Sequence, residues 1–287
     1  MAGKITLVAT PIGNLGDISQ RALDTLREAD LIAAEDTRHS GALLRHFGIK
    51  RPLISYYQHN EKAQEGTLLQ ALSEGKQVAL ISDAGTPGIS DPGAAILRQA
   101  AAAGYETDAV PGACAAIQAL VLSGLPTERF AFEGFLPRGA KLPPYLESIK
   151  EERRTLVLYE APHRIKETLT AAARVLGSQR PAALCRELTK KFQEVNRGTL
   201  GEICELWAER QTLGEFVLVI GGAEEQATEP NLQEVEEHLH RLLRGGMKHK
   251  AAAKEVARCY DLPVSQVYAL GLRLKEETEQ KDLSPRR

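Results

Sequence analysis

The chain reads QVALISDAGTPGISDPG over residues 77–93, a short apolar strand followed by a loop rich in glycine and proline. The alanine-rich segment 94–103 follows this loop and is typical of a helix. Strand, loop and helix in this order form the unit of α/β folds, whose sheets are mostly parallel and bind ligands beyond the carboxyl ends of the strands. We therefore expect function in the loops that follow strands.

The same alternation continues along most of the chain. Further strands are predicted at residues 5–9, 31–34, 107–110, 130–133, 155–159, 181–185 and 215–220. A helix is predicted over residues 17–29, with apolar residues on one face. Breaks near residues 124–127 and 221–222 divide the pattern. They predict an N-terminal α/β domain over residues 1–126 and a second over residues 127–222.

Residues 223–287 differ in character and predict a small helical module. Three helices are expected, at residues 232–244, 248–260 and 264–275. A turn at residues 261–263 joins the last two in a helix-turn-helix pattern, and a frayed tail is expected from residue 276. Residues 223–240 hold six Glu and no Lys or Arg, whereas residues 241–260 hold six Lys or Arg against one Glu. The basic segment favours phosphate contact, and a packing or dimer contact with a solvated basic face remains the alternative.

Composition limits the class of protein. The 287 residues carry 36 Lys plus Arg against 38 Asp plus Glu, a net charge of −2, which excludes a protein that is basic throughout and coats nucleic acid. The 43% hydrophobic and 26% charged residues are typical of a folded globular protein. No secretory signal and no apolar run long enough for a membrane span is evident, and the four cysteines lack metal-binding spacing. We expect a soluble, cytoplasmic protein without a metal site.

Three loops can bring backbone close to a ligand. In residues 10–17, the glycines and the start of a helix allow a ligand to approach the backbone. The same residues also fit a purely structural turn, or a dinucleotide-binding motif that lacks its first glycine and has Glu35 or Asp36 as the acid that binds the ribose. The stiff loop at 83–93 suits hydrogen bonds to an amino acid or a ribose, with Asp91 interpreted as a helix cap. Small residues at 110–116 leave room for a flat group.

Two clusters in the second half carry Glu, His, Arg and Lys directly after strands, at residues 159–164 and 186–191. Such clusters suit proton transfer or phosphate contact. Each residue alone is more often a surface ion pair or a helix cap, so these roles stay open on spacing alone.

Seven motifs occur in one order over residues 5–222: TPIGNL at 10–15, AEDTR at 34–38, SDAGTP at 82–87, VPG at 110–112, EGFLP at 133–137, YEAPHR at 159–164 and RELTK at 186–190. Together they resemble the tetrapyrrole methylase superfamily, and more closely its ribosomal branch, the 16S ribosomal RNA cytidine 2′-O-methyltransferases. Where tetrapyrrole enzymes carry GxGPGD and GDP, this chain has PIGNLGD and AGT. That departure counts against a corrin or porphyrin substrate.

The resemblance implies two α/β domains with S-adenosylmethionine in the cleft between them, a homodimer, and a decoding-centre cytidine of 16S rRNA in the small ribosomal subunit as substrate. The implied cofactor contacts are Pro11, Ile12, Gly13, Asp83, Ala84, Gly85, Thr86, Ile89, Cys114, Ala115, Tyr159 and Cys185. The predicted proton acceptors are Asp36, Glu160 and His163. The predicted RNA contacts are Arg38, Arg164, Arg186, Lys190, Lys248, Lys250, Lys254 and Arg258. A methyltransferase of tetrapyrroles or other small molecules and a non-enzymatic RNA-binding protein are the alternatives.

Overall fold

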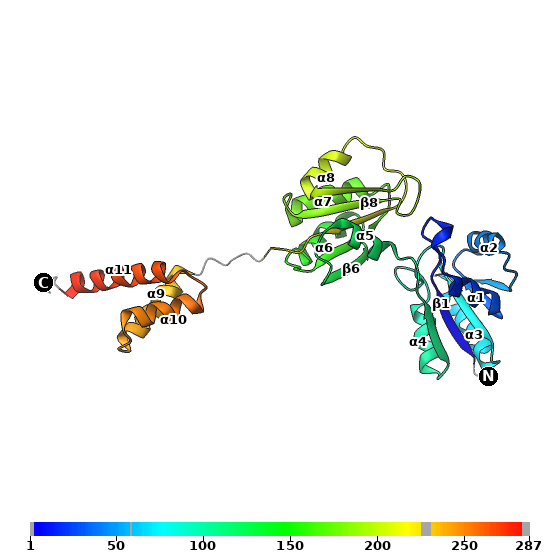
Figure 1. The fold of residues 1–287 in the computed structure, drawn as a ribbon, viewed down its shortest axis with the longest axis horizontal. Helices are drawn as coiled ribbons and strands as arrows, with labels where there is room; N and C mark the ends of the chain where they lie inside the picture. The colour runs from blue at the N-terminus through cyan, green and yellow to red at the C-terminus, as the bar shows by residue number, and fades with distance from the viewer. Residues whose placement is uncertain (1–2, 58, 225–230, 283–287) are drawn as a thin grey trace. The chain divides into compact units, whose positions relative to one another are not determined.

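The computed structural model describes residues 3–57, 59–224 and 231–282. The chain divides into two compact units, Met1–Glu224 and Glu225–Arg287. Figure 1 shows the first unit with two sheets and their helices, and the second as a small helical bundle. Within the described ranges, no helix is both long and apolar enough to cross a membrane.

The first sheet has the arrangement that the strand and helix alternation predicts. Its strands are β1 (Lys4–Val8), β2 (Leu31–Ala34), β3 (Leu53–Ser55), β4 (Gln77–Ile81) and β5 (Glu106–Val110). They pair in parallel in the order β3-β2-β4-β1-β5. Because β4 lies beside β1, the loops that follow these two strands emerge next to each other, where α/β sheets bind ligands.

Helices cover both faces of the first sheet. They are α1 (Gln20–Glu28), α2 (Thr37–His46), α3 (Glu61–Ser73) and α4 (Ala94–Ala102), with the short 3-10 turn η1 (Leu15–Asp17) before α1. Ile5 and Leu7 of β1 pack with residues of α3 and α4, whereas Val8 packs with residues of α1 and α2. This alternation follows from the two-residue period of a strand and buries the sheet on both sides.

The second sheet departs from the expectation of mostly parallel pairing. Its strands are β6 (Phe130–Phe135), β7 (Thr155–Glu160), β8 (Pro181–Arg186), β9 (Glu194–Thr199) and β10 (Phe216–Ile220), in the order β6-β7-β10-β8-β9. Only β6 and β7 pair in parallel. The short connection from β8 to β9 allows an antiparallel pair, and β10 returns between β7 and β8.

Helix α5 (Ala115–Ser123) packs on the second sheet, although it precedes residue 126. Its Ala116, Ala119 and Leu120 share a core with Val157 and Val219. The opposite face of this sheet carries α6 (Leu142–Ser148), which follows the 3-10 turn η2 (Gly139–Lys141), together with α7 (Ile165–Leu176) and α8 (Leu200–Trp207). The predicted boundary at 126/127 therefore separates α5 from the sheet that it covers.

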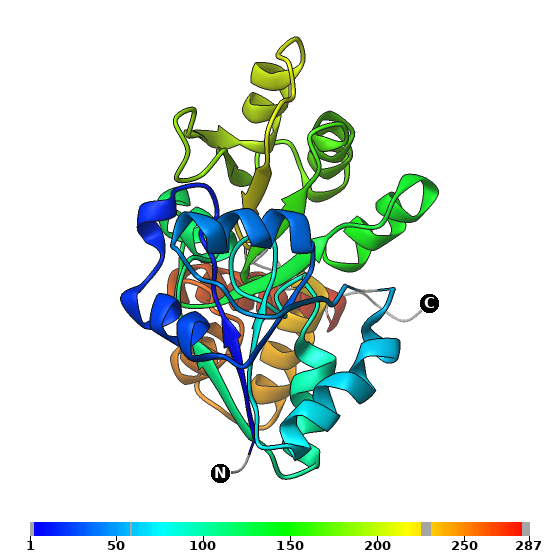
Figure 2. The same ribbon diagram turned by 90° about the vertical axis from the view of Figure 1, so that its right-hand side faces the viewer.

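The second unit consists of α9 (Leu232–Arg244), α10 (His249–Cys259) and α11 (Val264–Asp282) in its described part. Figures 1 and 2 show these helices packed together, in orange to red. Val235, Leu239, Val256 and Val267 form their common core. The predicted end of the last helix at residue 275 is wrong, because α11 continues to Asp282. Residues 225–230 of the predicted acidic segment and tail residues 283–287 lie outside the described residues.

Candidate functional site

The three glycine-rich loops of the first sheet meet, as expected for loops that follow parallel strands. Thr10 and Gly85 form an isolated antiparallel bridge, with N···O distances of 2.9 and 3.1 Å. The Thr86 hydroxyl donates to the Ala113 carbonyl at 3.0 Å, which joins the second loop to the third. Gly85 has φ +82°, and a Cβ there would lie 3.3 Å from Cγ2 of Ile12. This position therefore favours glycine.

A cavity of about 340 Å³ lies where these loops face the second sheet. Eight of the predicted cofactor residues line it: Ile12, Ala84, Gly85, Thr86, Ile89, Cys114, Ala115 and Tyr159. The remaining lining residues are Ser90, Asp91, Phe135, Glu160, Ala161, Pro162, Glu215, Phe216 and Val217. The Tyr159 hydroxyl accepts a hydrogen bond from the Ala116 amide at 3.1 Å, which ties β7 to the start of α5.

Three further predicted cofactor residues, Pro11, Gly13 and Asp83, line a neighbouring cavity of about 220 Å³. This second cavity shares Ile12, Ala84 and Glu215 with the first. Its other lining residues are Leu15, His39, Leu43 and Lys190. The loops thus line two adjoining spaces, and the sequence had assigned their residues to one ligand.

The structure does not bring Cys185 to either cavity. Its side chain is fully buried in the core beneath α5, with Sγ 3.9 Å from the Ala119 carbonyl. Burial raises the pKa of the thiol to about 11, so it stays protonated at neutral pH. Cys185 was predicted to contact the cofactor, but in the structure it packs in the core.

Asp36, one of the predicted proton acceptors, is the N-cap of α2. Its carboxylate accepts from the Arg38 amide at 2.8 Å and pairs with the Arg38 guanidinium at 3.1 Å. The hydrogen bond from that guanidinium is the main reason that the pKa of Asp36 falls to about 2. So acidic a group is a weak base at neutral pH. Arg38 itself has 92% of its side chain exposed.

Glu160 and Arg164 form a buried ion pair at the end of β7. One carboxylate oxygen lies 3.3 Å from Nη1 of Arg164, and the other accepts from the Thr168 hydroxyl at 2.6 Å. Arg164 also donates to the carbonyls of Leu136 and Pro137, at 3.2 and 2.9 Å. The prediction that Arg164 binds RNA phosphates is wrong, because its guanidinium is buried within the protein. His163, between these two residues, is exposed and follows the cavity-lining Pro162.

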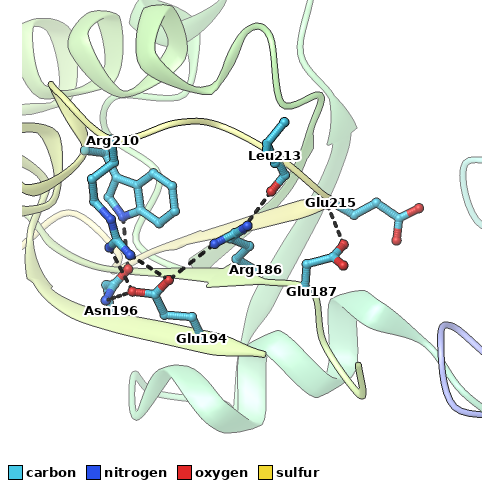
Figure 3. Close-up of polar contacts among 8 residues, drawn as sticks. Arg186, Glu187, Glu194, Asn196, Arg210, Leu213 and Glu215 are labelled. Carbon is cyan, nitrogen blue, oxygen red and sulfur yellow. Dashed lines mark hydrogen bonds and ion pairs between the residues drawn. The ribbon is translucent and has the colours of Figure 1, made fainter. Parts of the chain in front are cut away.

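Arg186 and Lys190 are engaged in networks of the second sheet. Figure 3 shows the Arg186 guanidinium pointing to the Leu213 carbonyl, at 2.7 Å, and to the Glu194 carboxylate, at 3.8 Å. Lys190 pairs with Glu187 and with Glu215, each at 2.9 Å. Arg186 therefore braces the β8-β9 pair, and phosphate contact would require breaking its internal bonds. Lys190 lines the second cavity with its charge already paired.

Asp91 lines the first cavity, whereas the sequence pattern predicts that it caps a helix. The N-cap of α4 is Gly93, with φ +127°, and the half-buried Asp91 side chain lines the first cavity instead. Burial is the main cause that raises its pKa to about 6, and the negative charges of Glu35 and Asp83 act in the same direction. The raised pKa is the property that would mark this residue as functional.

The predicted RNA-binding side chains of the second unit are all exposed: Lys248, Lys250, Lys254 and Arg258. Of the four, Arg258 forms a surface ion pair with Glu255 at 2.7 Å. They lie on or next to α10, whose Ala252, Ala253 and Val256 face the core of the bundle. Across the described ranges, no group of three or more His, Cys, Asp or Glu is placed to hold a metal ion.

Comparison with known families agrees with this geometry. The sequence model of the Tetrapyrrole (Corrin/Porphyrin) Methylases matches residues 4–204, which run from β1 into α8 and leave out β10. The matched range includes most of the loops around the cavities. The chain belongs to the tetrapyrrole methylase family. The match confirms the resemblance of the seven motifs to the tetrapyrrole methylase superfamily.

Three similar relatives carry the name Ribosomal RNA small subunit methyltransferase I. The Synechocystis protein is 45% identical over 278 residues, which cover 96% of this chain and 99% of the relative. The Pseudomonas aeruginosa protein is 50% identical over 224 residues, which cover 77% of this chain and 79% of the relative. The Escherichia coli O157:H7 protein is 43% identical, with 94% and 95% covered. The likeness therefore extends into the helical unit.

Solved structures agree with this fold over about three quarters of the chain. Uroporphyrin-III-C-methyltransferase from Thermus thermophilus matches with a TM-score of 0.55 and 24% identity, over 76% of this chain and 94% of that one. Diphthine synthase matches with a TM-score of 0.61 and 16% identity, over 77% and 90%. At these identities the likeness shows the tetrapyrrole methylase fold alone.

Proposed function

We propose that this chain transfers the methyl group of S-adenosylmethionine to the ribose 2′-hydroxyl of a decoding-centre cytidine in 16S rRNA, within the small ribosomal subunit. The observation that carries the proposal is the identity of 43 to 45% over nearly the full length of relatives named for small-subunit rRNA methylation. The motif departures at residues 10–17 and 84–86 weigh against a tetrapyrrole substrate.

The first cavity fits the cofactor chemically. Backbone at Ala84, Gly85 and Thr86 is open to a ligand, and the rings of Tyr159 and Phe135 offer apolar surface to a flat base. The cavity-lining residues include no Lys, Arg or His, which suits a cofactor that carries positive charge. The bound cofactor would supply a methyl group on a sulfonium, an electrophile that needs no metal.

The protein must then orient the ribose and accept its hydroxyl proton. The second cavity adjoins the first at Ile12, Ala84 and Glu215, so we assign the approach of the target nucleotide to that side. Of the three predicted proton acceptors, Asp36 is held by a cap and Glu160 by a buried ion pair. We therefore assign the role of proton acceptor to the exposed His163.

The helical unit supplies positive charge that the lining of the first cavity lacks. Its exposed Lys and Arg side chains on α10 are suited to RNA phosphates, which dominate the affinity of nucleic-acid complexes. The balanced total charge of the chain is then no obstacle to RNA binding, because residues 241–260 hold six Lys or Arg against one Glu and are locally basic. We extend the proposal to a homodimer that works in the cytoplasm, where the small subunit is assembled.

The test is transfer of radiolabelled methyl from S-adenosylmethionine to small subunits from a strain that lacks this protein, followed by mapping of the labelled nucleotide. Label on the 2′-oxygen of one cytidine is expected. Label on a uroporphyrin-type macrocycle instead would identify a tetrapyrrole methylase. Failure of S-adenosylmethionine to raise the melting temperature would favour a non-enzymatic RNA-binding protein.

A further inference from the structure

The carboxylates of the first cavity are not equally neutralised. Asp91, Glu160 and Glu215 line it, and no lining residue is Lys, Arg or His. Arg164 neutralises Glu160 from within the core at 3.3 Å, and Lys190 neutralises Glu215 at 2.9 Å. Among the described residues, no salt bridge within 4.0 Å joins a cationic side chain to Asp91.

The surroundings of Asp91 add negative charge. Glu35 and Asp83 act on it electrostatically and raise its pKa, whereas the nearby Ser82 hydroxyl lowers it. Tyr159 lies near enough to sense its charge. The backbone around it is fixed, because the Gly88 amide donates to the Pro92 carbonyl at 3.1 Å. Asp91 is therefore a half-buried carboxylate, held toward the cavity and without a cation of its own.

Burial of a carboxylate without a counter-charge is unfavourable, and a cationic ligand relieves that cost. S-adenosylmethionine carries two positive groups, the ammonium of its methionine part and the sulfonium. We infer that Asp91 is the counter-charge for a positive group of the cofactor bound in this cavity, an assignment that rests on the proposed function. The raised pKa of Asp91, about 6, agrees with a site that is completed by a cation.

Calorimetric binding to the full chain tests this assignment. Asp91→Asn keeps the shape of the side chain and removes its charge, so we expect it to weaken S-adenosylmethionine binding about tenfold or more at pH 7.5. S-adenosylhomocysteine, which lacks the sulfonium, separates the two groups. Equal losses for both ligands assign the ammonium to Asp91, and a loss confined to S-adenosylmethionine assigns the sulfonium.

Glu106→Gln is the matched control, because it also removes one negative charge, from a side chain that pairs with Lys4 on the first sheet and does not line the cavity. The control should bind both ligands as the wild type does. Circular dichroism melting of both variants checks that they fold. If the wild type binds S-adenosylmethionine and Asp91→Asn binds it equally well, the inference is overturned. If the wild type does not bind it, the proposed function fails first.

The pH dependence gives a second readout. A cation favours ionised Asp91, so binding should release a proton, and wild-type affinity should fall as pH drops through about 6. Glu35, Asp83 and Tyr159 face the same region and remain in the variant. The difference in pH dependence of affinity between the wild type and Asp91→Asn therefore reports the ionisation of Asp91 alone. If the affinities of the wild type and of Asp91→Asn depend on pH in the same way, the assignment is contradicted. It is also contradicted if Asp91→Asn loses methyl transfer but binds S-adenosylmethionine unchanged, because Asp91 would then act in proton transfer.

Discussion

Arg164 and Glu160 form an ion pair with 8% and 1% of their side chains exposed, and this pair joins the ends of two strands. Glu160 ends β7, and Arg164 binds the carbonyls of Leu136 and Pro137, just after β6. Glu160 lines the first cavity, and so does Phe135, the last residue of β6. The pair therefore fixes one wall of that cavity.

Replacement of Arg164 by Met should lower the free energy of unfolding by about 3 to 5 kcal/mol, because the buried Glu160 carboxylate loses its counter-charge. Urea denaturation followed by circular dichroism measures the change. The double variant Glu160→Gln, Arg164→Met serves as the control and should recover a large part of the loss, since it removes both charges. A loss below about 1 kcal/mol in the single variant would show that the pair is not a stability determinant.

The Asp36 cap should make stability depend on pH at low pH. The pKa of Asp36 is lowered to about 2 from 3.8, so its contribution is complete above pH 4 and is lost as pH falls toward 2. Asp36→Asn keeps a good N-cap and cannot titrate. We expect the wild-type minus variant difference in melting temperature to shrink as pH falls from 4 to 2. A difference that is constant over this range would contradict the lowered pKa.

The ligand loops were predictable because their chemistry is local. Glycines and small residues directly after apolar strands marked residues 84–86 and 114–115, and parallel pairing brings such loops together. Asp91 was interpreted wrongly for a related reason. Asp-Pro-Gly before an alanine-rich segment is a typical helix start. In the structure α4 begins at Ala94, so its N-cap is Gly93, two residues after Asp91.

Partners distant in sequence account for the other differences. Arg164 and Arg186 follow strands as phosphate-binding residues do, but the carbonyls of residues 136, 137 and 213 that hold them are fixed only by the fold. Strand β9 was not predicted because its sequence, EVNRGT, is polar, as edge strands often are. Its edge position beside β8 is a tertiary property that a local pattern does not carry.

His163→Asn should reduce the rate of methyl transfer about a hundredfold if this residue accepts the ribose proton. Binding of S-adenosylmethionine should stay unchanged, because His163 is exposed and does not line the first cavity. Single-turnover transfer to undermethylated small subunits, with the cofactor saturating, measures the rate. His46→Asn, at the exposed end of α2, is the control and should leave the rate unaltered. A rate within twofold of wild type in His163→Asn would remove this residue from the mechanism.

The exposed basic residues of α10 should determine how salt affects RNA binding. A variant with Gln at four positions, 248, 250, 254 and 258, loses four charges that are suited to phosphates. Each lost phosphate contact lowers the slope of log affinity against log salt by about 0.7 to 0.9. We expect a shallower slope and weaker binding to small subunits, measured by filter binding over a salt series, with unchanged binding of S-adenosylmethionine.

A variant of equal charge separates this local effect from total charge. Gln at positions 50, 51, 62 and 98 removes four exposed charges from the first unit. If the basic face of α10 binds RNA, this control keeps the wild-type slope, although its net charge matches that of the α10 variant. Equal slopes in the two variants would mean that only total charge matters. An unchanged slope in the α10 variant would instead assign the basic face to packing or solvent, the alternative that the sequence left open.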